Sequence, residues 1–154
     1  MVGPTRFLQQ QGYPINNDAD NYDATQLMCL VYDLQVFEDT KLKDIIVSDR
    51  CLLDTYVYTK YLFKKGKVSE PVFLSVEKVW LAKKDSYDVF FLPSKNDVPL
   101  VADGVRSEDE DFRNEIQSLF LEAIDLNGLK IYALEGSVEE RIESMKGIMK
   151  MIKR

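Results

Sequence analysis

The stretch Asp44-Ile-Ile-Val-Ser-Asp-Arg-Cys-Leu-Leu-Asp54 decides how the rest of the chain is interpreted. Its β-branched run, Ile45–Val47, is continuously apolar and too short for a helix, which is typical of a buried parallel strand. A helical pattern follows at once, so the run predicts a strand that ends in a polar turn. Ligands of open α/β sheets bind outside the carboxyl ends of the strands, which is where Asp49 and Arg50 would lie.

The pairing of Asp49 with Arg50 indicates a class of chemistry. In phosphoryl transfer a carboxylate accepts the proton of a substrate hydroxyl, and an arginine meets the charge of the phosphate. The same two side chains could instead form an ion pair that closes the end of a strand. The residues alone leave both interpretations open.

Length, composition and charge exclude several classes of protein. The 154 residues predict a single domain over 1–154, and a hydrophobic content of 45% predicts a globular one. The net charge of −6 argues against a nucleic-acid partner, which needs a basic surface. The chain has no histidine, which excludes a Ser-His-Asp triad and His-ligated zinc, and we expect no metal site in the protein itself.

The chain also lacks membrane signals. No run approaches the ~20 apolar residues of a membrane span, and the N-terminus has no apolar signal region. We therefore expect no membrane partner and a cytoplasmic location. The two cysteines, Cys29 and Cys51, fall on predicted apolar helix faces, and we expect buried free thiols rather than a disulfide.

Hydrophobic periodicity divides the chain into alternating helices and strands. Apolar residues at steps of three and four, together with end signals, predict helices over residues 1–11, 23–39, 51–65, 70–84, 107–127 and 137–154. Short apolar runs predict strands over 44–47, 87–93 and 129–134, and residues 94–105 are expected to form a loop. This alternation is typical of an α/β fold, a three-layer αβα arrangement around a parallel sheet.

The order of short motifs along this pattern resembles a known family. Ser48-Asp49-Arg50 follows one predicted strand and Tyr87-Asp88 opens the next; Asp103-Gly104-Val105-Arg106 precedes a helix that contains Arg113; Leu134-Glu135-Gly136-Ser137 leads into Glu140-Arg141. From about Arg6 to Arg141 the chain resembles the P-loop kinases. Its nearest likeness is to AAA-type ATPase and kinase domains similar to ribosylnicotinamide kinase and the deoxynucleoside kinases of bacteria and phages.

The resemblance implies four catalytic residues. Asp49 matches the general base toward the substrate hydroxyl, and Arg50 matches its phosphate-binding neighbour. Arg106 and Arg113 match the lid, whose arginines close over the transferred phosphate; an arginine there can be worth ~10³–10⁵ in rate. Both lid arginines lie among acidic residues, so they could equally be partners in a solvated charged face.

Binding residues are implied more loosely. Gly136 and Ser137 match the loop that passes the adenine ring, although the same pair is an ordinary helix entry. Arg6 and Gln26 resemble positions on the nucleoside side. From the residues themselves, Tyr58 could stack on a base, or it could pack between helices.

One expected motif does not occur. The family implies ATP and Mg²⁺ as cofactors, held by a Walker A loop of the form G-x-x-x-x-G-K-[ST]. No such sequence occurs in the chain, so we expect a P-loop NTPase-like fold whose first strand and P-loop are absent. ATP and Mg²⁺ are then implied by the resemblance alone, and this chain could leave both unbound. The strand that is missing would lie between those ending at Asp49 and Leu92, and its absence would leave unpaired edges. The sheet should then close up, recruit another chain or dimerise.

Two functions of different classes follow. The first is an ATP-dependent phosphotransferase-like domain that acts on a nucleoside or nucleotide and is impaired as given, because the loop that stabilises the phosphates is missing. The chain would then be a fragment of a full kinase, or a separate polypeptide would supply the missing element. The alternative is a non-catalytic binding or assembly module derived from a kinase scaffold. The sequence does not identify the phosphoryl acceptor.

Overall fold

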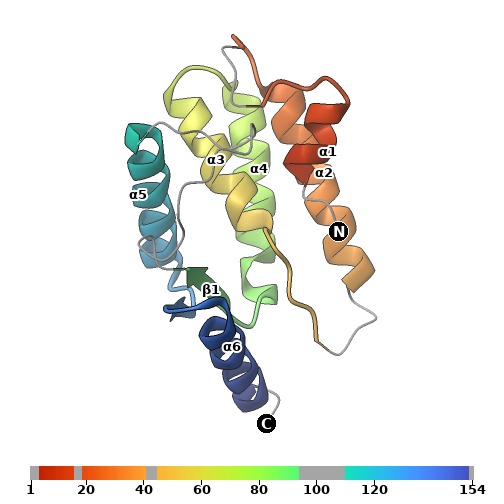
Figure 1. The fold of residues 1–154 in the computed structure, drawn as a ribbon. Helices are drawn as coiled ribbons and strands as arrows, with labels where there is room; N and C mark the ends of the chain where they lie inside the picture. The colour runs from red at the N-terminus through yellow and green to blue at the C-terminus, as the bar shows by residue number, and fades with distance from the viewer. Residues whose placement is uncertain (1–3, 16–18, 41–44, 94–109, 153–154) are drawn as a thin grey trace.

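The chain forms six α-helices and two strands within the residues that the structure, a computed structural model, describes: 4–15, 19–40, 45–93 and 110–152 (Figure 1). In chain order these are α1 (Pro4–Gln10), α2 (Asp23–Thr40), α3 (Leu52–Lys64), α4 (Glu70–Lys83), the short 3₁₀ helix η1 (Lys84–Ser86), β1 (Phe90–Pro93), α5 (Glu110–Asn127), β2 (Ile131–Leu134) and α6 (Val138–Ile152). Each of these helices and strands falls within or close to a predicted one.

The sheet consists of β1 and β2, which pair in parallel. Phe90 lies opposite Ile131, and Pro93 lies opposite Leu134. This confirms two of the three predicted strands and their parallel direction. The described part of the chain is mostly helical around this small sheet, so the predicted three-layer arrangement is not confirmed.

The predicted strand over 44–47 is wrong for its described residues. Ile45, Ile46 and Val47 belong to no strand, and their exposed fractions are 47%, 41% and 54%. Strand propensity depends on a neighbour that pairs with the backbone and covers one face. In the described residues the only ladder joins β1 to β2, so these β-branched residues have no strand to pair with. Asp49 and Arg50 therefore lie in the loop before α3 and not at the end of a strand.

Helix α3 is the centre of the hydrophobic core. It packs against α2, α4 and α5, and Figure 1 shows it between α5 on one side and α2 and α4 on the other. Leu52 and Val57 are fully buried on it, and the Tyr56 ring stacks on Trp80 with 6.1 Å between ring centroids. The Tyr56 ring thus packs between helices.

A polar seam joins α2 to α3 inside this core. The Thr55 hydroxyl donates to Oδ2 of Asp33 at 2.7 Å, and the Thr59 hydroxyl donates to Oε1 of Gln26 at 2.9 Å. All four side chains are buried. Buried polar groups are stabilising only when they are paired, so these two bonds fix how α2 sits along α3.

Other predictions are confirmed or extended by local structure. Cys29 is buried, Cys51 is half-buried, and both are free thiols. Ser137 and Glu140 form a capping box at the start of α6, in agreement with the helix entry expected there: Glu140 Oε2 accepts the Ser137 amide at 2.7 Å, and Ser137 Oγ accepts the Glu140 amide at 3.2 Å. Across the described ranges, none of the helices has the length and apolarity needed to cross a membrane.

The buried carboxyl of Asp33 predicts a pH-dependent stability. Burial raises the pKa of Asp33 to about 6, well above the ordinary ~4 of an aspartate; the Thr55 hydrogen bond opposes this rise and the charge of Asp54 adds to it. Between these values the folded state binds more protons than the unfolded state, so this contribution to stability is full below pH ~4 and lost as the pH rises through ~6. Asp33→Asn, which keeps an acceptor for Thr55, should therefore become more stable relative to wild type by roughly 2–3 kcal/mol between pH ~4 and ~7.

Urea unfolding of both proteins at the two pH values checks this expectation. Asp88→Asn is the matched control, because it makes the same chemical change at an exposed residue. A difference between Asp33→Asn and wild type that stays constant with pH would show that Asp33 is not a buried, protonatable carboxyl.

Candidate functional site

The loop that leads into α3 holds its backbone in an unusual conformation. Arg50 has φ of 80°, a left-handed value that residues other than glycine seldom adopt. The Ser48 hydroxyl donates to the Arg50 carbonyl at 2.6 Å and so braces the turn. Conformations of this kind cost free energy and persist where the surroundings over-determine them, often at functional sites.

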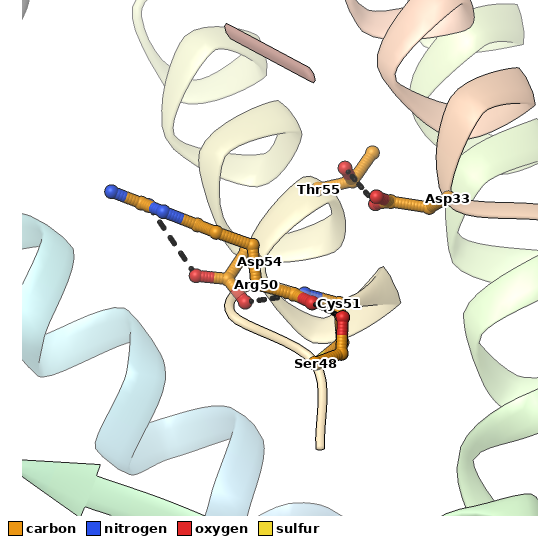
Figure 2. Close-up of polar contacts among 6 residues, drawn as sticks. All are labelled: Asp33, Ser48, Arg50, Cys51, Asp54 and Thr55. Carbon is orange, nitrogen blue, oxygen red and sulfur yellow. Dashed lines mark hydrogen bonds and ion pairs between the residues drawn. The ribbon is translucent and has the colours of Figure 1, made fainter. Parts of the chain in front are cut away.

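Asp54, in the first turn of α3, bonds to this loop with both of its carboxylate oxygens (Figure 2). Oδ2 accepts the backbone amide of Cys51 at 2.9 Å, and Oδ1 lies 3.4 Å from Nη1 of Arg50. Burial raises the pKa of Asp54, and the Arg50 charge and the Cys51 amide offset only part of that rise. Burial alone would lower the pKa of Arg50, but its interactions with Asp54, Tyr58 and Asp49 together outweigh that effect and leave the pKa raised.

The Arg50 side chain runs toward α5. In Figure 2 it points to the side on which α5 lies, whereas the Asp33–Thr55 bond lies on the opposite side of α3. Its guanidinium carbon is 5.8 Å from the centroid of the Tyr58 ring, within the range of a cation–π contact. Tyr58 in turn contacts two rings of α5, with centroids 6.3 Å from Phe112 and 6.5 Å from Phe120.

A cavity of about 250 Å³ lies beside Tyr58, between α3, α5 and the carboxyl end of β1. Its walls are mainly aromatic and aliphatic, and two polar side chains, Arg113 and Gln117, also line it. Arg113 is half-buried, and no carboxylate in the described part of the chain pairs with it. The remaining lining residues are Leu92, Pro93, Phe112, Ile116, Phe120 and Leu121.

The structure brings several predicted site residues together. Tyr58 and Arg113 line one cavity, and Arg50 contacts Tyr58. Asp49 is exposed in the loop next to Arg50. Arg106 lies outside the described residues, as does the side chain of Arg6 in α1.

Other predicted site residues lie elsewhere. Gln26 is buried in the seam between α2 and α3 and accepts the Thr59 hydroxyl. Gly136, with φ of 85°, and Ser137 lie at the exposed start of α6, which contacts β2. The Glu140 carboxylate occupies the space that a side chain at Gly136 would need.

The other residues that line the cavity were harder to recognise as site residues from their sequence pattern. Phe112 and Phe120 were interpreted as a core stripe, and their spacing of eight residues does place both rings on one face of α5. Leu92 and Pro93 line the cavity because they end β1, where open α/β sheets bind ligands. From the sequence, Asp54 could be a second carboxylate of the site or only a surface residue; a carboxylate three residues after a helix start is also half of a capping box.

The starts of α3 and α6 do not offer a cradle for the phosphates of a nucleotide. Such a cradle needs free backbone amides at a helix start. At α3 the Cys51 amide donates to Asp54 and the Leu52 amide to the Tyr87 hydroxyl at 3.4 Å, and at α6 the Ser137 amide donates to Glu140. In the described ranges no three acidic, thiol or imidazole side chains could hold a metal ion by themselves, whereas Mg²⁺ bound with a nucleotide takes phosphates and waters as ligands beside one or two carboxylates.

Comparison with known proteins identifies the class. The model of the AAA domain family, a P-loop NTPase type, matches residues 5–141, and the chain belongs to that family. This membership indicates a nucleotide-binding, ATPase-like domain, and AAA domains typically bind ATP and Mg²⁺. No curated protein and no solved structure matches the chain.

Proposed function

We propose that this AAA domain acts in phosphoryl transfer to a small nucleoside or nucleotide, and that the cavity beside Tyr58 holds the acceptor. The observation that carries the proposal is the cavity itself: aromatic walls at the carboxyl end of a parallel strand, with an arginine that has no carboxylate partner among the described residues. Parallel sheets bind ligands at that end of their strands.

The cavity walls suit a planar, partly apolar ligand. Tyr58, Phe112 and Phe120 offer ring surfaces for stacking, and Gln117 offers both a donor and an acceptor to the edge of a base. Ligand pockets typically measure about 300–1,000 Å³, so a cavity of 250 Å³ favours a ligand of nucleoside size. Arg113 would meet a phosphate group or the developing charge of the transfer.

In this proposal Asp49 accepts the proton of the acceptor hydroxyl, and Arg50 binds the phosphate beside it. Both side chains belong to one braced loop, and Arg50 contacts the ring of Tyr58 at the cavity. Arg106 as a second lid arginine, Arg6 and Gln26 as substrate contacts, and Gly136 with Ser137 as a nucleotide contact are further parts of the proposal. Beyond this nucleotide contact we assign no residue to the phosphoryl donor, because the backbone amides at the starts of α3 and α6 donate to other groups of the chain.

The proposal predicts how Arg113→Gln changes ligand binding. Charge-assisted hydrogen bonds contribute about 1.5–3 kcal/mol, so the substitution should weaken binding of a nucleoside monophosphate by roughly 10–100-fold. The affinity of the corresponding nucleoside, which lacks the phosphate, should change by less than about threefold. Isothermal titration calorimetry with adenosine, thymidine and their 5′-monophosphates measures both effects.

The matched control is Arg141→Gln on α6, whose guanidinium donates to the Ser137 carbonyl at 3.3 Å and does not line the cavity. It should bind like wild type. Equal losses in the two variants would assign the effect to overall charge, and absence of saturable binding of any of the four ligands to wild type would refute the proposed acceptor site.

A non-catalytic binding or assembly module remains the second candidate, and one observation favours it. The helix starts at α3 and α6 are capped by Asp54 and Glu140, side chains of the chain itself, which leaves those amides unavailable to phosphates. A converted scaffold would have no need for such a cradle. In this candidate the partner is a second copy of the chain or another protein that completes the sheet.

Turnover separates the two candidates. If the domain catalyses transfer, wild type given acceptor with Mg²⁺ and ATP should form phosphorylated product, and Asp49→Asn should abolish the product while leaving acceptor affinity within about twofold. Product formation followed by chromatography checks this. Acceptor binding without product in wild type would favour the non-catalytic module, and equal turnover in wild type and Asp49→Asn would remove Asp49 from the base role.

A further inference from the structure

We infer that Asp54 is a positioning residue: its carboxylate holds the Arg50 guanidinium against Tyr58, so that the arginine is set in place at the cavity before any ligand arrives. The inference rests on the proposed function for what Arg50 would bind. It adds a role for Asp54, which makes no direct contact with the cavity.

The backbone of the loop sets the direction of the Arg50 side chain. With φ of 80° at Arg50, the chain turns so that the side chain leaves the loop toward α5 (Figure 2). The Ser48 hydroxyl bond to the Arg50 carbonyl and the Asp54 bond to the Cys51 amide hold the two sides of this turn. The unfavourable conformation is therefore maintained by the side chains of Ser48 and Asp54, which both bond to backbone groups of this loop.

The Asp54 carboxylate bonds to two partners, one with each oxygen. Oδ2 of Asp54 accepts the Cys51 amide at 2.9 Å, so the carboxylate cannot turn freely. Oδ1 is then fixed at 3.4 Å from Nη1 of Arg50. A helix cap alone requires only the bond to the Cys51 amide, and charge neutralisation alone requires only the contact with the Arg50 guanidinium. Asp54 makes both interactions at once.

Without Asp54, the Arg50 side chain would have more conformational freedom. The Arg50 side chain is 41% exposed, and apart from Asp54 it interacts with Tyr58, whose ring centroid lies 5.8 Å from the guanidinium carbon, and with the charge of Asp49. A long side chain that loses its ion-pair partner samples more rotamers. The ion pair selects the one that lies along Tyr58, and a preorganised guanidinium binds phosphate more tightly than a mobile one.

Asp54→Asn separates positioning from neutralisation. Asparagine keeps an oxygen for the Cys51 amide but loses the charge that orients Arg50. If Asp54 positions Arg50, affinity for inorganic pyrophosphate should fall by about 5–10-fold in the variant. If Asp54 merely neutralises Arg50, removal of the negative charge should tighten pyrophosphate binding.

The experiment is a pyrophosphate titration followed by ³¹P NMR for wild type, Asp54→Asn, Arg50→Lys and the control Asp125→Asn, an exposed residue of α5. Arg50→Lys keeps the charge and removes the planar fork, so it should lose affinity to a similar extent. The double variant Asp54→Asn/Arg50→Lys should lose little more pyrophosphate affinity than either single variant, because both changes remove the same interaction. Asp125→Asn should bind like wild type. Tighter binding by Asp54→Asn, or fully additive losses, would overturn the inference.

A second measurement does not depend on any ligand. The Arg50 Nε–Hε signal of ¹⁵N-labelled protein, assigned with Arg50→Lys, should show a rigid side chain in wild type and a mobile one in Asp54→Asn. An equally rigid signal in both would overturn the inference. If wild type binds no pyrophosphate while the mobility changes as expected, the positioning role stands and the proposed phosphate site fails.

Discussion

Burial of α3 between α2, α4 and α5 is the constraint on which the rest of the structure depends. The helix contributes Leu52 and Val57 to the fully buried core, and it pairs its polar face with Asp33 and Gln26 of α2. Because one face of α3 packs against apolar side chains and the other forms hydrogen bonds with α2, the helix can neither rotate nor slide without losing buried contacts. The loop before α3 and the Tyr58 side of the helix are thereby fixed relative to α5, and that fixed relation creates the cavity.

Local electrostatics then shape the site on this frame. Acidic side chains within the first turns of α3 and α6 bond the backbone amides there, which favours the helix ends and removes those amides from phosphate recognition. Arginines supply positive charge instead, with Arg113 in the cavity wall and Arg50 against Tyr58. The described part of this AAA domain thus presents side-chain cations next to aromatic walls, a combination suited to a small anionic ligand.

Helix positions and two of the strands were predictable because periodicity and capping signals are local. The strand over Ile45–Val47 was not, because a β-branched run forms a strand only where another strand pairs with it, and sequence alone does not show that partner. Tyr58, as a possible base-stacking residue, and Arg113, as a lid arginine, were separate predictions; the structure places both at one cavity, and their roles stay predictions. Phe112 and Phe120 received no such role, because core packing accounts for aromatic residues at that spacing, and the sequence left Asp54 open between a second site carboxylate and a surface residue.

The most direct test of the central claim, that the cavity beside Tyr58 is a ligand site, is a ¹⁹F NMR titration of protein labelled with fluorotyrosine. The Tyr58 signal, assigned by its loss in Tyr58→Phe, would be followed as a nucleoside 5′-monophosphate is added. The account predicts a saturable shift of Tyr58 while the signal of Tyr132, in the small sheet and outside the cavity lining, stays in place. A Tyr58 signal that does not move, or equal drift of all tyrosine signals, would contradict it.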